Sequence, residues 1–142
     1  PSMKDILNAR VKFREYFRPF APSCLEEACG ELFDSAEASP YMLRVYQTLP
    51  NRLDDLASIT HVDGGARVQT VNEAMNGPYY RLIRAFGERT GIPCVLNTSF
   101  NIRGEPIVNT ADEALRCYLG TDMDYLFLHD RLVAKRGKPF PS

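Results

Sequence analysis

The sequence FGERTGIPCVLNTSFNIRGEPIV, residues 86–108, contains the sharpest change of pattern in the chain. A helix-forming run ends at Gly91, which is a typical C-cap. Residues 92–97, IPCVLN, are almost all apolar, as a short buried strand is. The chain then passes into LNTSFNIRGEP, which is rich in Asn, Ser, Thr, Arg and Glu. This order predicts a helix, a buried strand and a polar loop at the end of the strand.

The loop carries the chemical groups that a small, planar, charged ligand requires. Asn97 and Asn101 offer amide donors and acceptors, Ser99 offers a hydroxyl and Arg103 offers a fork of donors. Together these groups suit a carbonyl, an amide and a phosphate, and we interpret the loop as a pocket wall. The alternative is a strand-to-helix connection whose polar side chains hydrogen-bond their own backbone.

Other patterns extend this mixture of helices and strands over the chain. Ser2 is expected to cap a helix through Val11, and a second helix is expected to start at Ser23 and cover CLEEACGELF. SPYMLRVYQT predicts a strand, and Asp63-Gly64-Gly65 predicts a hairpin turn between Ile59–Val62 and Ala66–Val71. A helix follows over residues 72–91. Thr110 and Glu113 form a capping box for the next helix, and DYLFLHD and LVAKR predict two final strands. The fold class is α/β, with an open mixed sheet.

Length and charge limit the classes of protein. The 142 residues predict one domain, 1–142, with Lys+Arg 17 against Asp+Glu 18 and a net charge of -1. This near-neutral charge lacks the excess of basic residues that is expected of a dedicated nucleic-acid binder. No long apolar run or signal peptide is found, so membrane insertion and export are not expected. The chain starts without Met in a helix-like run, which we interpret as a domain cut from a longer protein.

The chain contains four cysteines, Cys24, Cys29, Cys94 and Cys117. They show neither CxxC spacing nor the density of a disulfide scaffold, so we expect them to be buried thiols in a reducing cytoplasm. His61 with Asp63 is too small a set for a metal site, so no metal ligands are predicted. The sequence also lacks a P-loop and a GxGxxG motif.

Two further groups of residues are candidates for ligand contact. Lys12, Arg14 and Arg18 lie between aromatic residues where the first helix gives way to extended chain, and they could form an anion clamp. The alternative is a solvated basic face. Arg67 and Gln69 alternate around Val68, so on one strand they would face the same side and line a pocket. The alternative is the exposed face of an edge hairpin.

Five ordered motifs resemble the C-terminal domain of the O-carbamoyltransferase family, which includes nodulation and antibiotic-biosynthesis carbamoyltransferases. They are MKDILNARVKFREYFRPFAPS, SPYMLRV, ITHVDGGARVQTV, FGERTGIPCVLNTSFNIRGEPIV and DEALRCYLG. The resemblance implies a YrdC-like domain with an open, twisted mixed sheet and helices packed on it. Such a domain binds carbamoyl phosphate and ATP, with Mg²⁺ held through the nucleotide phosphates, and forms carbamoyl-adenylate.

The resemblance also implies a partner and roles for individual residues. An N-terminal ASKHA-like domain of the same protein, absent here and carrying an iron site, would transfer the carbamoyl group to a hydroxyl. The family's phosphate contacts would fall on Lys12 and Arg18, its sheet arginine on Arg67, and its strand-end contacts on Asn97 and Ser99. Further substrate contacts are expected at Arg14, Gln69, Asn101 and Arg103.

Two functions from other classes remain alternatives. A YrdC-like fold with a basic concave face could bind RNA, although the near-neutral charge argues against it. The chain could also be a docking domain without catalytic function of its own.

Overall fold

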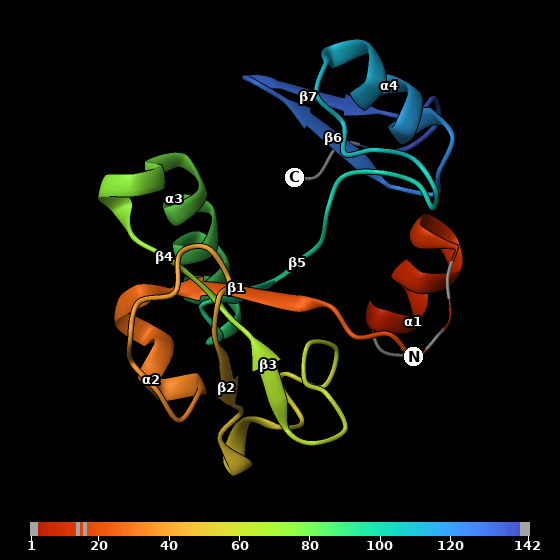
Figure 1. Cartoon of the computed structure of the whole chain (residues 1–142). Coiled ribbons are helices and arrows are strands. Elements are labelled where there is room, and N and C mark those ends of the chain that lie inside the picture. The colour runs from red at the N-terminus through yellow and green to blue at the C-terminus, as the bar shows by residue number, and fades with distance from the viewer. Residues whose placement is uncertain (1–2, 14, 16, 140–142) are drawn as a thin grey trace. The chain divides into compact units, whose positions relative to one another are not determined.

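The computed structural model describes residues 3–13, 15 and 17–139 and confirms the mixed α/β class (Figure 1). The chain divides into two compact units. The central unit is Pro19–Thr98. The terminal unit combines Met3–Arg18 with the chain from Ser99 onward.

A three-stranded mixed sheet organises the central unit. β1 (Ala21–Leu25) lies between β4 (Gln69–Val71), to which it is parallel, and β5 (Cys94–Asn97), to which it is antiparallel (Figure 1). The predicted strand over residues 92–97 is therefore confirmed. Since β1 has a neighbour on each side, both edges of its backbone are hydrogen-bonded inside the sheet.

The predicted helix from Ser23 is wrong at its start, because Ser23 belongs to β1. Residues 23–25 are buried and pair with neighbouring strands, and this tertiary pairing outweighs the local helical pattern. The chain turns into a 3₁₀ helix at Glu26–Ala28 and a short α2 at Cys29–Leu32 only after the strand has ended.

The predicted hairpin around Asp63 is also wrong. β3 (Gly65–Arg67) pairs with β2 (Val45–Gln47), whereas residues 59–62 form no strand. The Asp63 carboxylate accepts a hydrogen bond from the Gly65 amide at 2.9 Å, so the Asp-Gly-Gly sequence closes a turn before β3. The strand predicted over residues 39–48 is reduced to β2, since Met42 has a left-handed φ of 58° that breaks the extended run.

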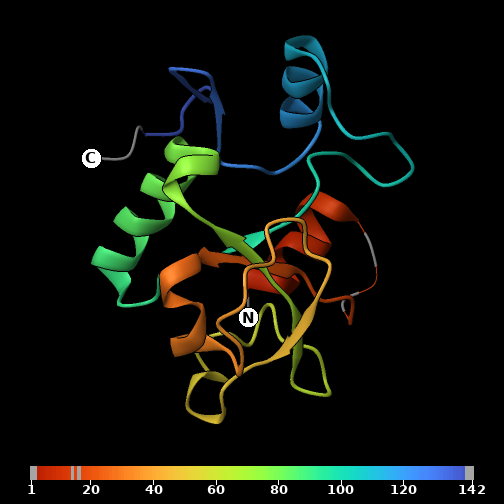
Figure 2. The same cartoon turned by 60° about the vertical axis from the view of Figure 1, so that its left-hand side comes forward.

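Helix α3 (Glu73–Thr90) packs on this sheet and confirms the predicted helix (Figure 2). Asn72 caps its start, and Gly91 ends it with a φ of 76°. The helix is kinked at Asn76, where the backbone leaves the helical region before Pro78. The buried core between helix and sheet contains Leu25, Ala28, Val71 and Ile83.

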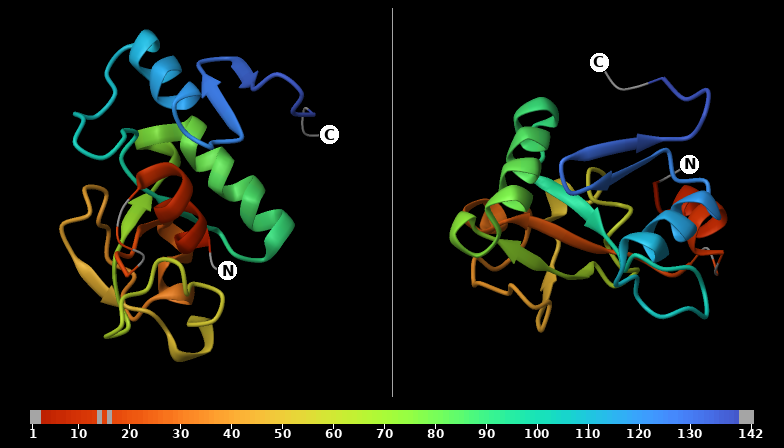
Figure 3. Two further views of the ribbon diagram at one scale, coloured as in Figure 1. Left: turned by 90° about the vertical axis from the view of Figure 1, so that its right-hand side faces the viewer. Right: turned by 90° about the horizontal axis from the view of Figure 1, so that it is seen from above.

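The terminal unit begins with α1 (Met3–Leu7) and a π-helical turn at Asn8–Lys12, which confirms helix through Val11. Ser2 lies outside the described residues. The second part of the terminal unit consists of α4 (Ala111–Leu119), β6 (Tyr125–Leu128) and β7 (Arg131–Ala134), as predicted. The antiparallel β6–β7 pair packs on α4 through a core of Ala114, Tyr118 and Leu126 (Figure 3).

The capping box that begins α4 is present in full. The Thr110 hydroxyl accepts from the Glu113 amide, and the Glu113 carboxylate accepts from the Thr110 amide. None of the helices in the described part of the chain has both the length and the apolar character that crossing a membrane requires.

Candidate functional site

A cluster of side-chain amides lies at the end of the central sheet. The Oε1 atom of Gln69 accepts hydrogen bonds from the Ser23 hydroxyl at 2.7 Å and from Asn97 Nδ2 at 2.8 Å. The Nε2 atom of Gln69 donates to the Pro40 carbonyl at 3.2 Å. We call Ser23, Gln69 and Asn97 the amide cluster. It joins two residues that the sequence predicted, Gln69 and Asn97, with one that it did not, Ser23.

Strand register explains why these three side chains meet. Ser23 lies opposite Gln69 in the parallel β1–β4 pair, and Ala21 lies opposite Asn97 in the antiparallel β1–β5 pair. The cluster therefore collects one side chain from each of three neighbouring strands. Among the described residues, no hydrogen bond is recorded for Asn97 Oδ1, so this acceptor is available to a ligand.

A cleft of about 190 Å³ adjoins the amide cluster, with Gln69 in its wall. Tyr41, Met75 and Tyr79 give it apolar surface, and Asn76 adds an amide at the helix kink. Burial raises the pKa of Tyr79, an effect that its contact with the Ser23 hydroxyl partly opposes. The cleft therefore combines aromatic surface with amide groups and a neutral phenol.

Arg67 and Gln69 belong to different strands. Arg67 ends β3 opposite Val45, whereas Gln69 begins β4 in the other sheet. The prediction that the two residues share one strand is therefore wrong, because the buried Val68 separates β3 from β4. The prediction that their side chains face the same side stays a prediction. The Arg67 side chain is exposed, and no hydrogen bond or ion pair is recorded for it among the described residues.

Lys12 is a buried anchor of the polar loop in the terminal unit. It is only 6% exposed, and its Nζ donates to Asn101 Oδ1 at 2.7 Å and to the Asn101 carbonyl at 3.1 Å. It also donates to the carbonyl and the hydroxyl of Ser99. The structure thus brings together three predicted site residues, Lys12, Ser99 and Asn101, in one hydrogen-bonded group.

The loop also satisfies part of its own backbone. The Ser99 hydroxyl donates to Asn101 Oδ1 at 2.7 Å, and Asn101 Nδ2 donates to the Glu105 carbonyl at 2.9 Å. The Val108 amide donates to the Phe100 carbonyl at 2.9 Å. The alternative interpretation of the loop, self-satisfaction of its polar groups, therefore describes Ser99 and Asn101, while Asn97 bonds to Gln69 of the central sheet instead.

Two of the predicted cations, Arg18 and Arg103, lie at the surface of the terminal unit. Arg103 Nη2 lies 3.7 Å from the Glu15 carboxylate, and Arg18 Nη1 lies 3.9 Å from it. Arg103 also donates to the Phe13 carbonyl at 3.4 Å. Arg14 lies outside the described residues. The structure therefore groups Arg18 with Arg103 around one carboxylate, while the ammonium group of Lys12 is buried against the loop.

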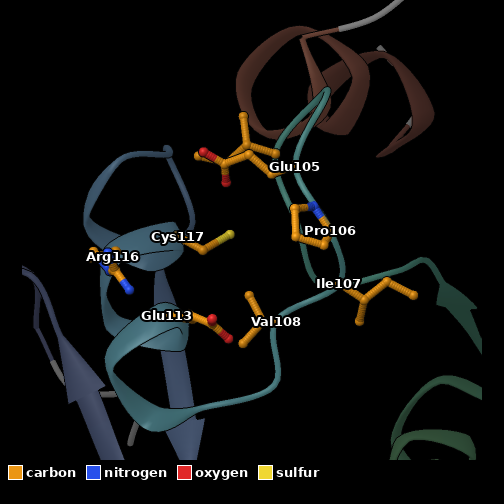
Figure 4. Close-up of a pocket in the computed structure, with 8 residues that line it drawn as sticks. Glu105, Pro106, Ile107, Val108, Glu113, Arg116 and Cys117 are labelled. Atoms are coloured by element: carbon orange, nitrogen blue, oxygen red, sulfur yellow. The ribbon is translucent and has the colours of Figure 1, made fainter.

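A second, larger cleft of about 310 Å³ lies in the terminal unit between the loop and α4 (Figure 4). Glu113, Arg116 and Cys117 line it from α4, where their spacing places them on one helical face. Glu105 lines it from the loop. Sequence reasoning missed this cleft, because it used Glu113 only as a helix cap, although the spacing of these three residues was a usable signal.

Local contacts set the charge states in this cleft. The backbone amides of Asn109 and Thr110 bind the Glu113 carboxylate and lower its pKa. Burial raises the pKa of the Cys117 thiol, and the negative charge of Glu105 raises it further. At neutral pH the cleft therefore contains the ionised Glu113 carboxylate beside a neutral thiol.

The cysteines confirm the prediction of buried thiols, since all four are free and buried. Contact with Cys29 and burial raise the pKa of Cys24, and burial raises that of Cys94 to about 12. In the described part of the chain, no group of three or more His, Cys, Asp or Glu side chains is arranged to hold a metal ion.

Comparison with known proteins matches residues 1–135 to the family model described as "Carbamoyltransferase C-terminus". The chain is 46% identical to the nodulation protein NolO of Bradyrhizobium diazoefficiens over 94% of its length, which is 25% of that protein. It is 46% identical to NolNO of Sinorhizobium fredii over 94% of the chain and 20% of NolNO. An uncharacterized Synechocystis protein is 41% identical over 97% of the chain and 26% of that protein. The chain thus spans between a fifth and about a quarter of these relatives.

Proposed function

The chain belongs to the carbamoyltransferase C-terminus family, and we propose that it binds carbamoyl phosphate and ATP and forms carbamoyl-adenylate. The balanced reaction consumes one carbamoyl phosphate, one ATP and one water. Water releases inorganic phosphate from carbamoyl phosphate, and an oxygen of the resulting carbamate attacks the α-phosphorus of ATP. The bond from the α-phosphorus to the bridging oxygen breaks, and pyrophosphate leaves.

The amide cluster is the observation that carries this proposal. A carbamoyl group is planar and has an NH₂ donor beside a carbonyl acceptor, which is the complement of a side-chain amide. Asn97 Oδ1 is available to accept a hydrogen bond from the carbamoyl NH₂. Gln69 Oε1 accepts hydrogen bonds from Asn97 Nδ2 and from the Ser23 hydroxyl, and so holds the Asn97 side chain in place. Pre-positioned amides of this kind bind a planar group without ordering cost at the moment of binding.

Phosphate recognition requires positive charge. In the central unit Arg67 supplies an exposed guanidinium, which suits two phosphate oxygens at once. Lys12 and Arg18 lie in the terminal unit, and their phosphate contacts remain predictions. The substrate contacts of Arg14 and Arg103 also remain predictions, as does the strand-end contact of Ser99. The role we assign to all these cations is to offset the charge that collects on phosphate oxygens during adenylation.

The cleft beside Gln69 fits the planar base of a nucleotide. Its aromatic and thioether surfaces, from Tyr41, Met75 and Tyr79, suit the two faces of a heterocycle, and Asn76 offers an amide to its edge. Mg²⁺ is proposed to bind through the nucleotide phosphates, because this ion needs few protein ligands when phosphates are present.

The rest of a longer enzyme would complete the reaction. Since the chain matches only 25% of NolO and 20% of NolNO, we propose that an N-terminal ASKHA-like domain with an iron site accompanies it. That domain would transfer the carbamoyl group from the adenylate to a substrate hydroxyl. The role of the present chain is activation of the carbamoyl group.

Calorimetric titration with carbamoyl phosphate, with and without a non-hydrolysable ATP analogue and Mg²⁺, tests the proposal directly. We expect saturable binding that Asn97→Ala weakens at least about tenfold, equivalent to about 1.4 kcal/mol. Asn109→Ala is the matched control, since it removes an exposed amide side chain outside the amide cluster. Arg67→Gln is expected to weaken carbamoyl phosphate more than it weakens a neutral carbamoyl compound such as ethyl carbamate.

The two alternatives give different results in the same experiment. Absence of heat in every titration, with a normally folded chain, would reject activation by this chain. Tight, strongly salt-dependent binding of RNA instead would support the RNA-binding alternative. Restored activity of a separately produced N-terminal domain, without ligand binding by the chain itself, would support the docking alternative.

A further inference from the structure

The cleft between the polar loop and α4 in the terminal unit has two chemically different walls. Ile102, Pro106 and Val108 supply apolar surface from the loop. Glu113, Arg116 and Cys117 line the cleft from α4. Figure 4 shows the Glu113 carboxylate and the Cys117 sulfur on the side of α4 toward the loop. A ligand that fits this cleft therefore needs one apolar side and one polar, charged side.

The charged groups of the cleft are of both signs. Among the described residues, neither the Glu105 carboxylate nor the Arg116 guanidinium has a recorded hydrogen bond or ion pair. Arg116 lies close enough to Glu113 to help lower the pKa of that carboxyl. An anion held by Arg116 would therefore lie next to a carboxylate, and the arrangement suits a ligand that carries a carboxylate and an ammonium on the same carbon.

The buried thiol adds a third feature to the polar wall. Cys117 is only 3% exposed, and no hydrogen bond is recorded for its sulfur among the described residues. Burial and the charge of Glu105 raise the pKa of this thiol, so it offers a weak S–H donor rather than a nucleophile.

We propose that this cleft binds a small aliphatic α-amino acid as its zwitterion. Arg116 binds the carboxylate, Glu105 and Glu113 receive the ammonium group, and the loop wall of Ile102 and Val108 covers the aliphatic side chain. The volume of about 310 Å³ is at the lower end of small-molecule pockets, which span about 300–1,000 Å³. The site shares no residue with those assigned to carbamoyl phosphate or ATP, so the two proposals can be tested separately.

Titration of the ¹⁵N-labelled chain, followed by two-dimensional NMR, tests this inference with three probes of similar size. L-Leucine carries both charges, isopentylamine lacks the carboxylate, and 4-methylpentanoate lacks the ammonium. We expect L-leucine to shift the backbone amide signals of Val108, Glu113 and Cys117 to saturation. Each of the other two probes is expected to bind at least about tenfold more weakly, because each satisfies only one sign of charge.

Matched variants separate the charged contacts from general effects. Arg116→Met should weaken L-leucine about tenfold and leave isopentylamine unchanged, whereas Arg89→Met, on the exposed end of α3, should change neither. Glu105→Gln should weaken both amines, with Asp112→Asn on α4 as its control. Shifts that grow linearly without saturation, equal affinity for isopentylamine and L-leucine, or full binding by Arg116→Met would each overturn the proposal.

Discussion

Replacing Lys12 with Met should release the polar loop while keeping most of the packing of the side chain. The Lys12 ammonium group is within hydrogen-bonding distance of four acceptor atoms of Ser99 and Asn101, but it has only three protons. Hydrogen bonds to a charged group each contribute about 1.5–3 kcal/mol. Two effects reduce the total: water reaches the freed loop carbonyls, and the variant no longer buries an ammonium group. We therefore expect Lys12→Met to lower the free energy of unfolding by about 2–4 kcal/mol.

Urea unfolding followed by circular dichroism measures this loss, and hydrogen exchange locates it. Exchange should increase at the amides of Glu105 and Val108, which donate within the loop to the carbonyls of Ile102 and Phe100. Lys138→Met is the control, since Lys138 is an exposed lysine paired with Asp124, and its loss should lower the free energy of unfolding much less than Lys12→Met does. A change below about 0.5 kcal/mol for Lys12→Met, with unchanged loop exchange, would refute the anchoring role.

The same variant separates anchoring from the predicted phosphate contact. If Lys12→Met keeps its stability but loses carbamoyl phosphate, then the ammonium group acts on the ligand rather than on the loop. If stability and binding fall together, a variant that leaves Lys12 in place but disturbs the loop, Asn101→Ala, should reproduce both losses.

Three further outcomes follow from the structure. The pKa of Glu113 is lower in the folded chain than in the unfolded chain. Its carboxylate therefore stabilises the fold above the unfolded pKa, and this stabilisation is lost as the pH falls through the folded pKa. Thermal melting temperatures of Glu113→Gln and of the native chain should therefore converge in acid. Gly87→Ala should lower the free energy of unfolding, measured with urea, by about 1–3 kcal/mol, because an added Cβ would lie 2.8 Å from Pro93 Cβ. Arg84→Ala, at an exposed position of the same helix, is the control, and an equal loss from it would contradict this explanation. Iodoacetamide at pH 8 should label the thiols of Cys24, Cys29 and Cys94 only after urea is added, because all three are buried. Rapid labelling of the native chain would contradict this burial.

Local signals in the sequence predicted the elements that depend on local contacts. Gly91 has the positive φ that a helix C-cap adopts, and Thr110 with Glu113 forms the capping box that their spacing indicates. These features need only neighbouring residues, so a single sequence is sufficient to find them.

Elements that depend on distant pairing were predicted less well. Ser23 sits in a helical pattern but is paired with Gln69 and Val95, and no local rule contains either partner. The same limitation applies to the candidate site. The polar character of Asn97 and Gln69 was visible in the sequence, but their direct hydrogen bond depends on the order of strands in the sheet.

The pairing of Ala21 with Asn97 has a kinetic consequence for the whole chain. The terminal unit is made of two segments that the entire central unit separates in sequence, so forming it directly would require closing a long loop at a large entropic cost. Folding of the central sheet brings residues near both ends of that loop onto neighbouring strands and shortens the effective loop. We therefore expect the central unit to fold first and the Lys12–Ser99 contact to form afterwards. Pairing of β1 with β5 brings together the two segments of the terminal unit that this contact joins.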